Sequence, residues 1–322
     1  MKSSRIFWLC AVPAAMCFQY AGAQTYPVKP IRIVVAFPPG GGTDIVTRLI
    51  APRLGAALGQ QVVVENRAGA DGIIGTDLVA KSAPDGYTLF VGTAGNLAIN
   101  QTLYSKVPFN IERDFAALTQ VVSVDMMLTV HPSLPVKNVG ELVALAKARK
   151  GDLNYGSTGI GGIPHLAMEL FNYTAGTRMA HIPYKGGAPA LSDLLGGHIP
   201  MMVQSTVQGL TSVKSGRLRA VALLSAKRAA LLPNVPTASE SLPDCVASNW
   251  YGLVVPVNTP AAIQKRIYEE YVKVVRSPDM KELIAAQGAE SVGSTPEEFS
   301  AFLKLEIAKW ARIIKTANVR AD

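Results

Sequence analysis

Two glycine-rich segments are the residues of this chain best placed to do chemistry. Residues 37–44 read FPPGGGTD and directly follow the apolar run 31–36, while residues 156–162 read GSTGIGG and precede a helical pattern that starts near Ile163. A helix N-terminus exposes unpaired N–H groups and a partial positive charge, and glycine lets that backbone approach a ligand closely. Two such loops in separate α/β units predict a jaw that closes on a small anion.

Known phosphate and dinucleotide motifs do not explain these loops. The first loop ends in Gly42-Thr43-Asp44 and lacks the lysine of a P-loop, and the second has Pro164 where a dinucleotide fingerprint needs its third glycine. Thr43 or Asp44 is expected either to cap the helix that follows or to contact a ligand, and the sequence favours neither.

A catalytic interpretation finds little support in the residue types and spacings. Ser157 lies close in sequence to His165, but no G-x-S-x-G elbow surrounds it. The four histidines show no zinc spacing, and no pair of carboxylates suggests acid–base catalysis. His165 is expected either to line a cleft or to pack within its helix. We therefore expect binding without catalysis, metal or cofactor, with a secreted hydrolase using Ser157 and His165 as the alternative.

Composition places the chain among exported two-domain proteins. Its 322 residues can form two cores, and 49% hydrophobic against 17% charged residues excludes disorder. Lys2 and Arg5 precede the apolar segment 6–17, and a small-residue site ends at Ala23. This pattern predicts a signal peptide over 1–23, cleavage after Ala23 and a periplasmic location, because the apolar segment is too short to span a membrane.

The cysteines and the charge narrow the possibilities further. Cys17 would suggest a lipoprotein, but Met16 stands where a small residue is expected. Cys245 remains alone after cleavage, and we expect it to be a small buried side chain. Loss of Lys2 and Arg5 lowers the net charge from +8 to +6, since 1–23 holds no acid. The basic residues are scattered, which argues against nucleic-acid binding and favours capture of anions.

Apolar runs of strand length alternate with helical patterns through the chain. The first part has the order βαβαβ, with strands 31–37, 61–65 and 88–92 and helices 44–58 and 73–82. This order predicts a parallel sheet covered by helices. The second part predicts strands 126–130, 153–156, 178–184, 199–204 and 218–224 and helices 163–175, 187–196 and 206–215. Strand 250–255 follows, and the chain is expected to be helical from 259.

Two weakly patterned stretches predict the domain organisation. Residues 101–125 and 225–249 show little periodicity, and each is expected to carry a crossing between domains. Domain 1 would then comprise 24–124 and 250–322, and domain 2 would comprise 125–249.

Helix caps support the predicted helix starts. Asn138 followed by Glu141 predicts a capping box, as does Thr295-Pro296 followed by Glu298. Thr259-Pro260 predicts a threonine cap before an N1 proline.

Several segments together resemble the Bug family of periplasmic solute-binding proteins, the receptors of tripartite tricarboxylate transporters. The resemblance runs over essentially the whole chain after residue 23. Its matching segments are 26–32 (YPVKPIR), 37–44 (FPPGGGTD), 64–70 (VENRAGA), 84–89 (PDGYTL), 181–190 (HIPYKGGAPA) and 216–220 (GRLRA). The resemblance implies a type II periplasmic-binding-protein fold, with two Rossmann-like α/β domains, two crossings and a ligand cleft between them.

The resemblance also implies a ligand and a set of contacts. Family members bind carboxylated solutes, including citrate, dicarboxylates, acidic amino acids and aromatic acids, and pass them to membrane transporter subunits. The two loops grip these ligands, often through bridging waters. Carried onto this chain, the contacts are Phe37, Gly40, Gly41, Thr43 and Asp44 from one domain, Ser157, Thr158, Gly159, Gly161 and His165 from the other, and Thr93, Ala94 and Asn96 on the cleft floor.

One departure from the family pattern concerns specificity. After the strand ending near Met202, the family usually has Phe, an acidic or small residue and Asn-Leu-Pro, where this chain reads 203–207 VQSTV. We expect Gln204 and Ser205 to meet the distal end of the ligand, and the missing acid disfavours an amino-acid ligand. The expected receptor is a monomer, and the alternative partner is a membrane sensor kinase to which it presents the same ligand.

Overall fold

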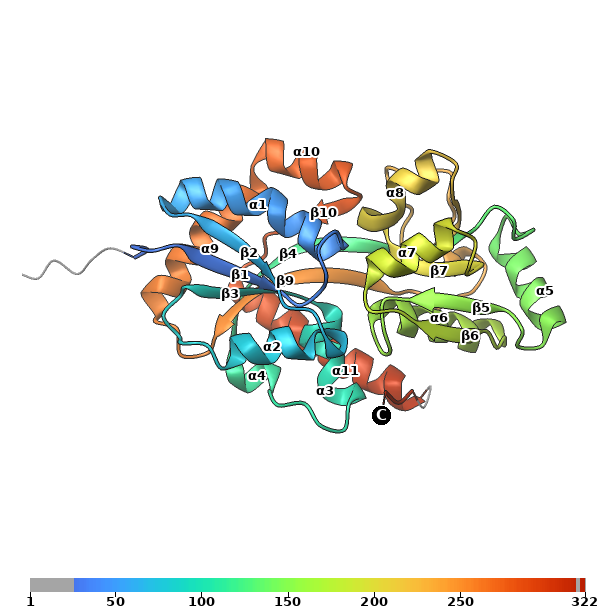
Figure 1. Cartoon of the computed structure of the whole chain (residues 1–322), viewed down its shortest axis with the longest axis horizontal. Helices are drawn as coiled ribbons and strands as arrows, with labels where there is room; N and C mark the ends of the chain where they lie inside the picture. The colour runs from blue at the N-terminus through green and yellow to red at the C-terminus, as the bar shows by residue number, and fades with distance from the viewer. Residues whose placement is uncertain (1–25, 317–318, 322) are drawn as a thin grey trace, which may run out of the picture.

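The computed structural model describes residues 26–316 and 319–321, so the predicted signal peptide lies outside the described residues. The described chain folds into two α/β lobes that share long central strands (Figure 1). Hydrogen-bonded strands follow the order β2-β1-β3-β9-β4-β7-β5-β6, and β10 and β8 pair with β4 off this path. In the part of the chain that the structure describes, no helix combines the length and hydropathy needed to cross a membrane.

The strands are β1 (Ile31–Val35), β2 (Val62–Asn66), β3 (Thr88–Thr93), β4 (Phe115–Val130), β5 (Asn154–Ser157), β6 (Ala180–Pro183), β7 (Met201–Ser205), β8 (Arg219–Leu223), β9 (Ser248–Pro256) and β10 (Ala289–Ser291). The α-helices are α1 (Gly42–Leu58), α2 (Ile73–Ala80), α3 (Asn100–Leu103), α4 (Ile111–Asp114), α5 (Val139–Arg149), α6 (Ile163–Ala175), α7 (Gly187–Leu195), α8 (Thr206–Lys214), α9 (Ala261–Arg276), α10 (Pro278–Ala286) and α11 (Pro296–Thr316). Short helical turns are η1 (Ala70–Gly72), η2 (Gly95–Ile99) and η3 (Ala238–Glu240).

The first lobe contains the predicted parallel unit. Strand β1 pairs in parallel with both β2 and β3, which confirms the βαβαβ interpretation. Strand β9 then adds antiparallel to β3, so the complete sheet is mixed. Strands β1 and β3 are almost wholly buried because helices cover both faces of the sheet, as expected for a parallel arrangement.

Strand β4 carries the first connection between the lobes. Its residues from Phe115 to Asp125 pair with β9, and those from Met126 to Val130 pair with β7 and β8. The crossing expected within 101–125 is therefore made by a strand, whose first half the sequence pattern did not reveal. This half of β4 is buried and bulged, so its apolar residues do not alternate with polar ones.

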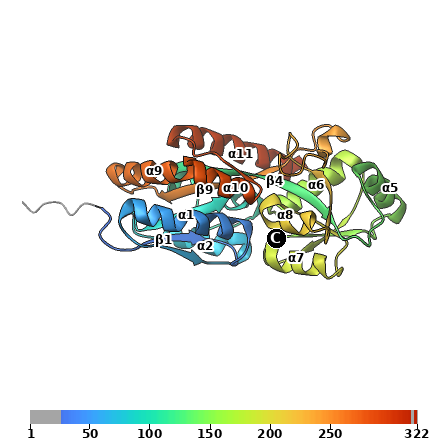
Figure 2. The same ribbon diagram turned by 90° about the horizontal axis from the view of Figure 1, so that it is seen from above.

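The return connection runs through β9. Ala247 N donates a hydrogen bond of 2.6 Å to Leu224 O. The segment between them therefore begins and ends at the same place beside the sheets. Strand β9 then enters the first lobe beside β4 (Figure 2). The two lobes are thus linked by neighbouring antiparallel strands.

Most of the predicted caps are present. Asn138 Oδ1 accepts a hydrogen bond from Glu141 N (2.9 Å), and Thr295 Oγ1 accepts one from Glu298 N (3.2 Å). The predicted cap at Thr259 was wrong, because its hydroxyl donates to Pro256 O and α9 begins at Ala261. Thr43 and Asp44 also do not cap α1, since that helix begins at Gly42 with Gly41 as its N-cap.

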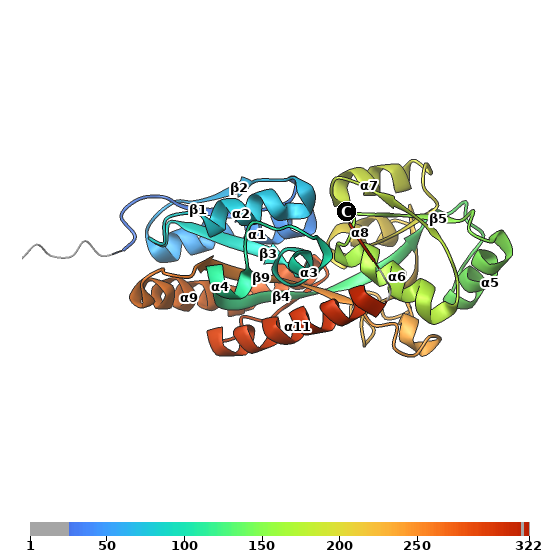
Figure 3. The ribbon, with the colours of Figure 1, turned by 90° about the horizontal axis from the view of Figure 1, so that it is seen from below.

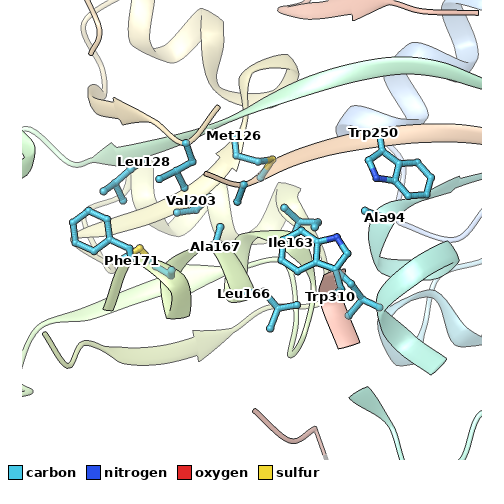
Figure 4. Close-up of a cluster of buried hydrophobic side chains, with 14 of the residues drawn as sticks. Ala94, Met126, Leu128, Ile163, Leu166, Ala167, Phe171, Val203, Trp250 and Trp310 are labelled. Carbon is cyan, nitrogen blue, oxygen red and sulfur yellow. The ribbon is translucent and has the colours of Figure 1, made fainter. Parts of the chain in front are cut away.

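Helix α11 ties the lobes together along one side. Figure 3 shows it running along β4 toward α6 of the second lobe. Its Trp310 is fully buried in a hydrophobic cluster that also holds Ile163 and Leu166 (Figure 4). Cys245, buried as expected, belongs to the same cluster.

Candidate ligand-binding site

A cavity of about 70 Å³ lies between the two lobes, where the glycine loops face each other. Its walls come from the ends of β1, β3, β5 and β7 and from the helices that follow them. The lining residues are Phe37, Pro38, Gly41, Gly42, Thr43, Asp71, Thr93, Gly95, Met126, Thr158, Gly162, Ile163, Pro164, Gly187, Ala188, Ser205, Gln208, Asn249 and Tyr251.

Four helices begin at this cavity. Helices α1, α6 and α7 have glycine N-caps with no side-chain hydrogen bond, whereas Ser205 caps α8 by accepting from Gln208 N (3.3 Å). The positive ends of these helices therefore converge, and three of them have no side chain bonded to their free N–H groups. Among the described lining residues there is no lysine or arginine. The attraction for an anion comes from backbone dipoles.

Asp44 holds the first glycine loop in shape. Its carboxylate accepts hydrogen bonds from Gly40 N, Arg48 Nε and Asn66 Nδ2, each at 2.9 Å. Burial alone would raise the pKa of Asp44, but these bonds hold its pKa below the ordinary value. Asn66 also donates to Phe37 O (3.0 Å), so both ends of the loop are fixed. Gly40 and Asp44 lie outside the cavity lining and support it from behind.

Gly42 lies at a close contact between the two lobes. A Cβ built on Gly42 would lie 2.5 Å from the Tyr251 hydroxyl and 3.0 Å from Ser205 Oγ. Burial raises the pKa of Tyr251 to about 12, although its hydroxyl interacts with Thr43 and Ser205. The first lobe thus presents a neutral hydroxyl network to the second lobe through a position that only glycine fits.

The second glycine loop is held by a stack of aromatic rings. His165 Nδ1 accepts a hydrogen bond from Gly161 N (2.8 Å), and the rings of His165 and His181 stack at 3.8 Å. Ser157 is fully buried, and its hydroxyl lies 2.5 Å from His181 Nε2. Burial lowers the pKa of His165 to about 3 and that of His181 to about 4, so both rings are neutral at pH 7.

This arrangement corrects two interpretations. The pairing of Ser157 with His165 was wrong, because the histidine that contacts the serine is His181. Ser157 is fully buried and lies outside the cavity lining, so the structure lends no support to the hydrolase alternative. His165 lies outside the cavity lining, where it supports the loop instead of facing the cleft.

The cleft floor places Thr93 in the cavity and two neighbours outside it. Asn96 Oδ1 accepts from Thr93 N (3.1 Å) and Thr93 Oγ1 (3.2 Å), and Asn96 Nδ2 donates to Asp71 O (3.3 Å). Ala94 is fully buried beneath them. Asn96 therefore orients two lining residues, Thr93 and Asp71.

The sequence predicted that Gln204 contacts the ligand, but in the structure Gln208 lines the cavity in its place. Gln204 is fully buried and donates to Thr129 Oγ1 (2.8 Å), outside the cavity lining. Gln208, one residue before Gly209 on α8, lines the cavity with its side-chain nitrogen unpartnered. The helix that begins at Thr206 turns residue 208, and not residue 204, toward the cleft.

Asp71 is the lining residue that the sequence reasoning missed most clearly. It is the only charged residue among the described lining residues, and it sits in η1 with φ +48°. The sequence does carry a signal, since an acid stands between Gly69 and Gly72 directly after the family-like segment 64–70. Glycine neighbours permit the tight turn that brings this acid into the cleft.

The cavity thus gathers part of the predicted set. The predicted residues that line it are Phe37, Gly41, Thr43, Thr93, Thr158 and Ser205. The predicted residues that lie outside the lining are Gly40, Asp44, Ala94, Asn96, Ser157, Gly159, Gly161, His165 and Gln204. Within the second group, Asp44, Ser157 and His165 bond to the backbone of the glycine loops, so the sequence identified the loops more reliably than the faces of individual residues.

A second hollow of about 720 Å³ lies near α8 and α10. It is lined by residues from β4, the 225–232 segment and the turn at Gly288. None of the predicted site residues lines it. We therefore take the cavity between the glycine loops as the candidate site.

Two α/β lobes joined by neighbouring strands around a small inter-lobe cavity define a two-domain solute-binding protein. The model of the tripartite tricarboxylate transporter family receptor, TctC, matches residues 46–319. Protein BugT of Bordetella pertussis (strain Tohama I) is 38% identical over 300 residues, covering 92% of each chain. The chain therefore belongs to the TctC receptor family, and its resemblance to the Bug proteins is confirmed.

Solved structures agree with the architecture. An R. palustris protein solved with adipate has a TM-score of 0.89 and 33% identity, over 92% of this chain and 99% of that one. MatC of Rhodopseudomonas palustris, solved with bound malate, has a TM-score of 0.85 and 27% identity, over 90% of this chain and 100% of that one. The predicted periplasmic-binding-protein fold is confirmed at this level.

Proposed function

We propose that this protein is a periplasmic receptor that captures a small carboxylated metabolite between its lobes and delivers it to a tripartite tricarboxylate-type membrane transporter. The convergence of the α1, α6 and α7 N-termini on one cavity carries the proposal. Glycine caps leave backbone N–H groups for the ligand, and such groups bind carboxylates without a basic side chain. Binding, and not chemical transformation, is the activity that this site supports.

The size of the cavity limits the ligand. About 70 Å³ accommodates the centres of roughly five water molecules. Relatives were solved with adipate and with malate, which are small dicarboxylates. We propose a ligand of similar size for this chain.

Closure of the lobes would trap that ligand. We propose that residues 24–124 and 250–322 move as one body against residues 125–249. Bending within β4 and β9 would serve as the hinge, because these strands join the two sheets near Asp125 and Ser248. The cavity forms only when both bodies contribute their glycine loops.

The predicted signal peptide and the family support a proposal for the cellular setting. We propose export, cleavage after Ala23, and action as a periplasmic monomer that meets membrane transporter subunits. Pull-down of the tagged receptor from membranes, with and without added dicarboxylate, tests this partner. Recovery of a sensor kinase instead of transporter subunits would favour the alternative partner.

Binding itself can be tested by a thermal-shift screen, and a matched pair of variants then tests the location of the site. A thermal-shift screen of residues 24–322 against succinate, malate, adipate, citrate, glutamate and benzoate comes first. A ligand at ~100 times its Kd stabilises by about 2.7 kcal/mol, and each kcal/mol raises Tm by about 2–4 °C in chains of 150–250 residues. We therefore expect a shift of about 5 °C.

Ala188→Glu adds a carboxylate to the cavity lining at the start of α7, and Ala144→Glu makes the same change on the exposed face of α5. We expect Ala188→Glu to weaken binding by tenfold or more and Ala144→Glu to leave it unchanged. Equal binding by both variants would place the ligand elsewhere.

A further inference from the structure

Three buried side-chain atoms of the cavity lining have no hydrogen-bond partner. They are Oδ1 and Oδ2 of Asp71, which accept hydrogen bonds, and Nε2 of Gln208, which donates them. Buried polar atoms are nearly always paired. Asp71 and Gln208 line the cavity from opposite lobes, and unpaired atoms of opposite hydrogen-bonding type there indicate the kind of ligand that would satisfy them.

The position of Asp71 is fixed by its surroundings. Asn96 Nδ2 and Asn100 Nδ2 both donate to Asp71 O, at 3.3 and 2.9 Å. The side chain reaches the opposite lobe, since a Cβ built on Gly159 would lie 2.9 Å from Asp71 Oδ1. Gly159 has φ +150°, so this position requires glycine for its backbone as well as for the space it leaves to the carboxylate. The carboxylate is therefore held at the boundary between the lobes.

No cationic side chain of the described chain pairs with the Asp71 carboxylate. Asp71 takes part in no ion pair of the described chain, and the described lining residues include no lysine or arginine. An unpaired buried carboxylate is costly, so it either takes up a proton or receives a cation from a ligand. Burial raises the pKa of Asp71 to about 7, which shows how little compensation the protein itself supplies.

We propose that Asp71 makes this cleft selective for small carboxylates that also carry a protonated amine, with the ammonium against Asp71 and a carboxylate toward Gln208 and the helix N-termini. This inference rests on the proposed receptor function and names its ligand class. An ammonium has three donors and a full positive charge, so it can satisfy both oxygens of Asp71 and neutralise them. A ligand hydroxyl offers one donor and no charge, and leaves the carboxylate uncompensated.

The proposal reverses an expectation drawn from the sequence. The absence of an acid at Gln204 disfavoured an amino-acid ligand, but Gln204 lies outside the cavity lining. The fold supplies an acid from η1 of the other lobe instead. In this proposal the acid that recognises the amine comes from the turn before α2 and not from β7.

Matched ligand pairs test this assignment. Isothermal titration calorimetry would compare succinate with L-aspartate and glutarate with L-glutamate, in the wild type, in Asp71→Asn and in Asp71→Gly. Asparagine and glycine both tolerate the left-handed backbone of residue 71, so folding should be preserved. Asp77→Asn removes an acid of neighbouring α2 that pairs with Lys81 outside the cavity, and serves as the control.

We expect the wild type to prefer the aminated member of at least one pair by tenfold or more, since a hydrogen bond to a charged group contributes about 1.5–3 kcal/mol. Both Asp71 variants should lose this preference, and Asp77→Asn should keep it. Titrations in buffers of different ionisation enthalpy should show proton uptake by the wild type with succinate and none with L-aspartate. The uptake should vanish in Asp71→Asn.

Three results would overturn the inference in distinguishable ways. If the dicarboxylates bind the wild type as tightly as their aminated partners, Asp71 does not select for an amine, and the receptor function stands. If an amine preference survives in both Asp71 variants, another group recognises it. If no carboxylate binds the wild type or the Asp71 variants, the proposed receptor function fails and the inference fails with it.

Discussion

At the residue scale, the cleft is defined by positions where a single atom decides the geometry. Gly41 and Gly42 are adjacent in the same loop, but they meet different surroundings. A Cβ on Gly41 would contact only Pro38 O, at 3.6 Å, whereas a Cβ on Gly42 would lie 2.5 Å from the Tyr251 hydroxyl. Gly41 has an extended backbone with φ −76°, so it needs no special conformation. The two glycines therefore allow a matched test.

Gly42→Ala should weaken carboxylate binding by about tenfold or more, because its methyl group displaces Tyr251 and Ser205 and holds the lobes apart. Gly41→Ala adds a methyl group to the cavity lining without this clash between lobes, and should lose less affinity than Gly42→Ala. Calorimetric Kd values for both variants give the comparison, with circular dichroism to verify folding. Equal loss of affinity in the two variants would contradict the assigned contact.

The stacked histidines give a second residue-scale prediction, on acid stability. Burial lowers the pKa of His165 to about 3 and that of His181 to about 4, whereas unfolded histidine titrates near 6.5. The unfolded chain therefore binds more protons below pH 6.5, so stability falls as the pH drops toward 4. Glu169, 4.0 Å from His165 Nε2, would offset part of this loss.

Between pH 7 and 4.5 we expect the free energy of unfolding to fall by about 2–4 kcal/mol from these two rings. His165→Asn should show a smaller acid loss than the wild type, because one of the two rings is gone. His198→Asn, at an exposed position, should retain the full dependence. Urea titrations at pH 7 and pH 4.5 measure the free energy of unfolding. The same decrease in all three proteins would refute the assignment.

At the element scale, α11 packs against β9 and also contacts the second lobe. Glu306 is buried and its Oε2 accepts from Trp250 Nε1 (2.8 Å) on β9 and from Trp310 Nε1 (3.0 Å) on α11. Lys309 pairs with the other oxygen. One carboxylate thus satisfies two buried indoles from different elements, so it carries the docking of this helix.

Glu306→Leu should lower the free energy of unfolding by about 3 kcal/mol, because two buried indole N–H groups lose their acceptor. Glu306→Gln keeps a carbonyl oxygen in place and should cost less. Glu297→Leu, at an exposed position in the first turn of α11, should cost no more than about 1 kcal/mol. Chemical denaturation of the three variants would decide it, and a neutral Glu306→Leu would contradict the role given to this contact.

At the scale of the whole molecule, the proposed closure would bring a buried acid, Asp71, against the opposite lobe. Asp71 is the only charged group among the described lining residues, and burial raises its pKa to about 7 in the closed cleft. In the proposed opening, water would reach the carboxylate and its pKa would return toward the ordinary value. A protonated Asp71 therefore favours the closed form, and this advantage is lost as the pH rises through about 7.

Small-angle X-ray scattering of the ligand-free protein should show a larger radius of gyration at pH 8 than at pH 5.5. Asp71→Asn is neutral at both values and should give one radius throughout. Asp77→Asn should follow the wild type. A pH-independent radius in the wild type would show that Asp71 does not control closure.

Local patterns predicted the elements of this fold well where helices or short strands stand alone. Helix 163–175 has the predicted bounds, and the capping box at Thr295 marks the start of α11. Strand β4 was predicted only over 126–130, because its first half is buried between two strands and has no alternation. Strand β10 was missed, since three residues are too few for any periodicity.

The sequence by itself determined the family, the α/β class and the two glycine loops, because these depend on local backbone requirements and contiguous motifs. Tertiary structure alone decided which side chains face the cleft. His165 and Gln204 turn away, while Asp71 and Gln208 enter, because contacts between residues distant in the sequence set these orientations. His165 stacks on His181, Gln204 donates to Thr129, and Asn96 and Asn100 hold the Asp71 carbonyl. The charge in the cavity therefore became visible only once the lobes were brought together.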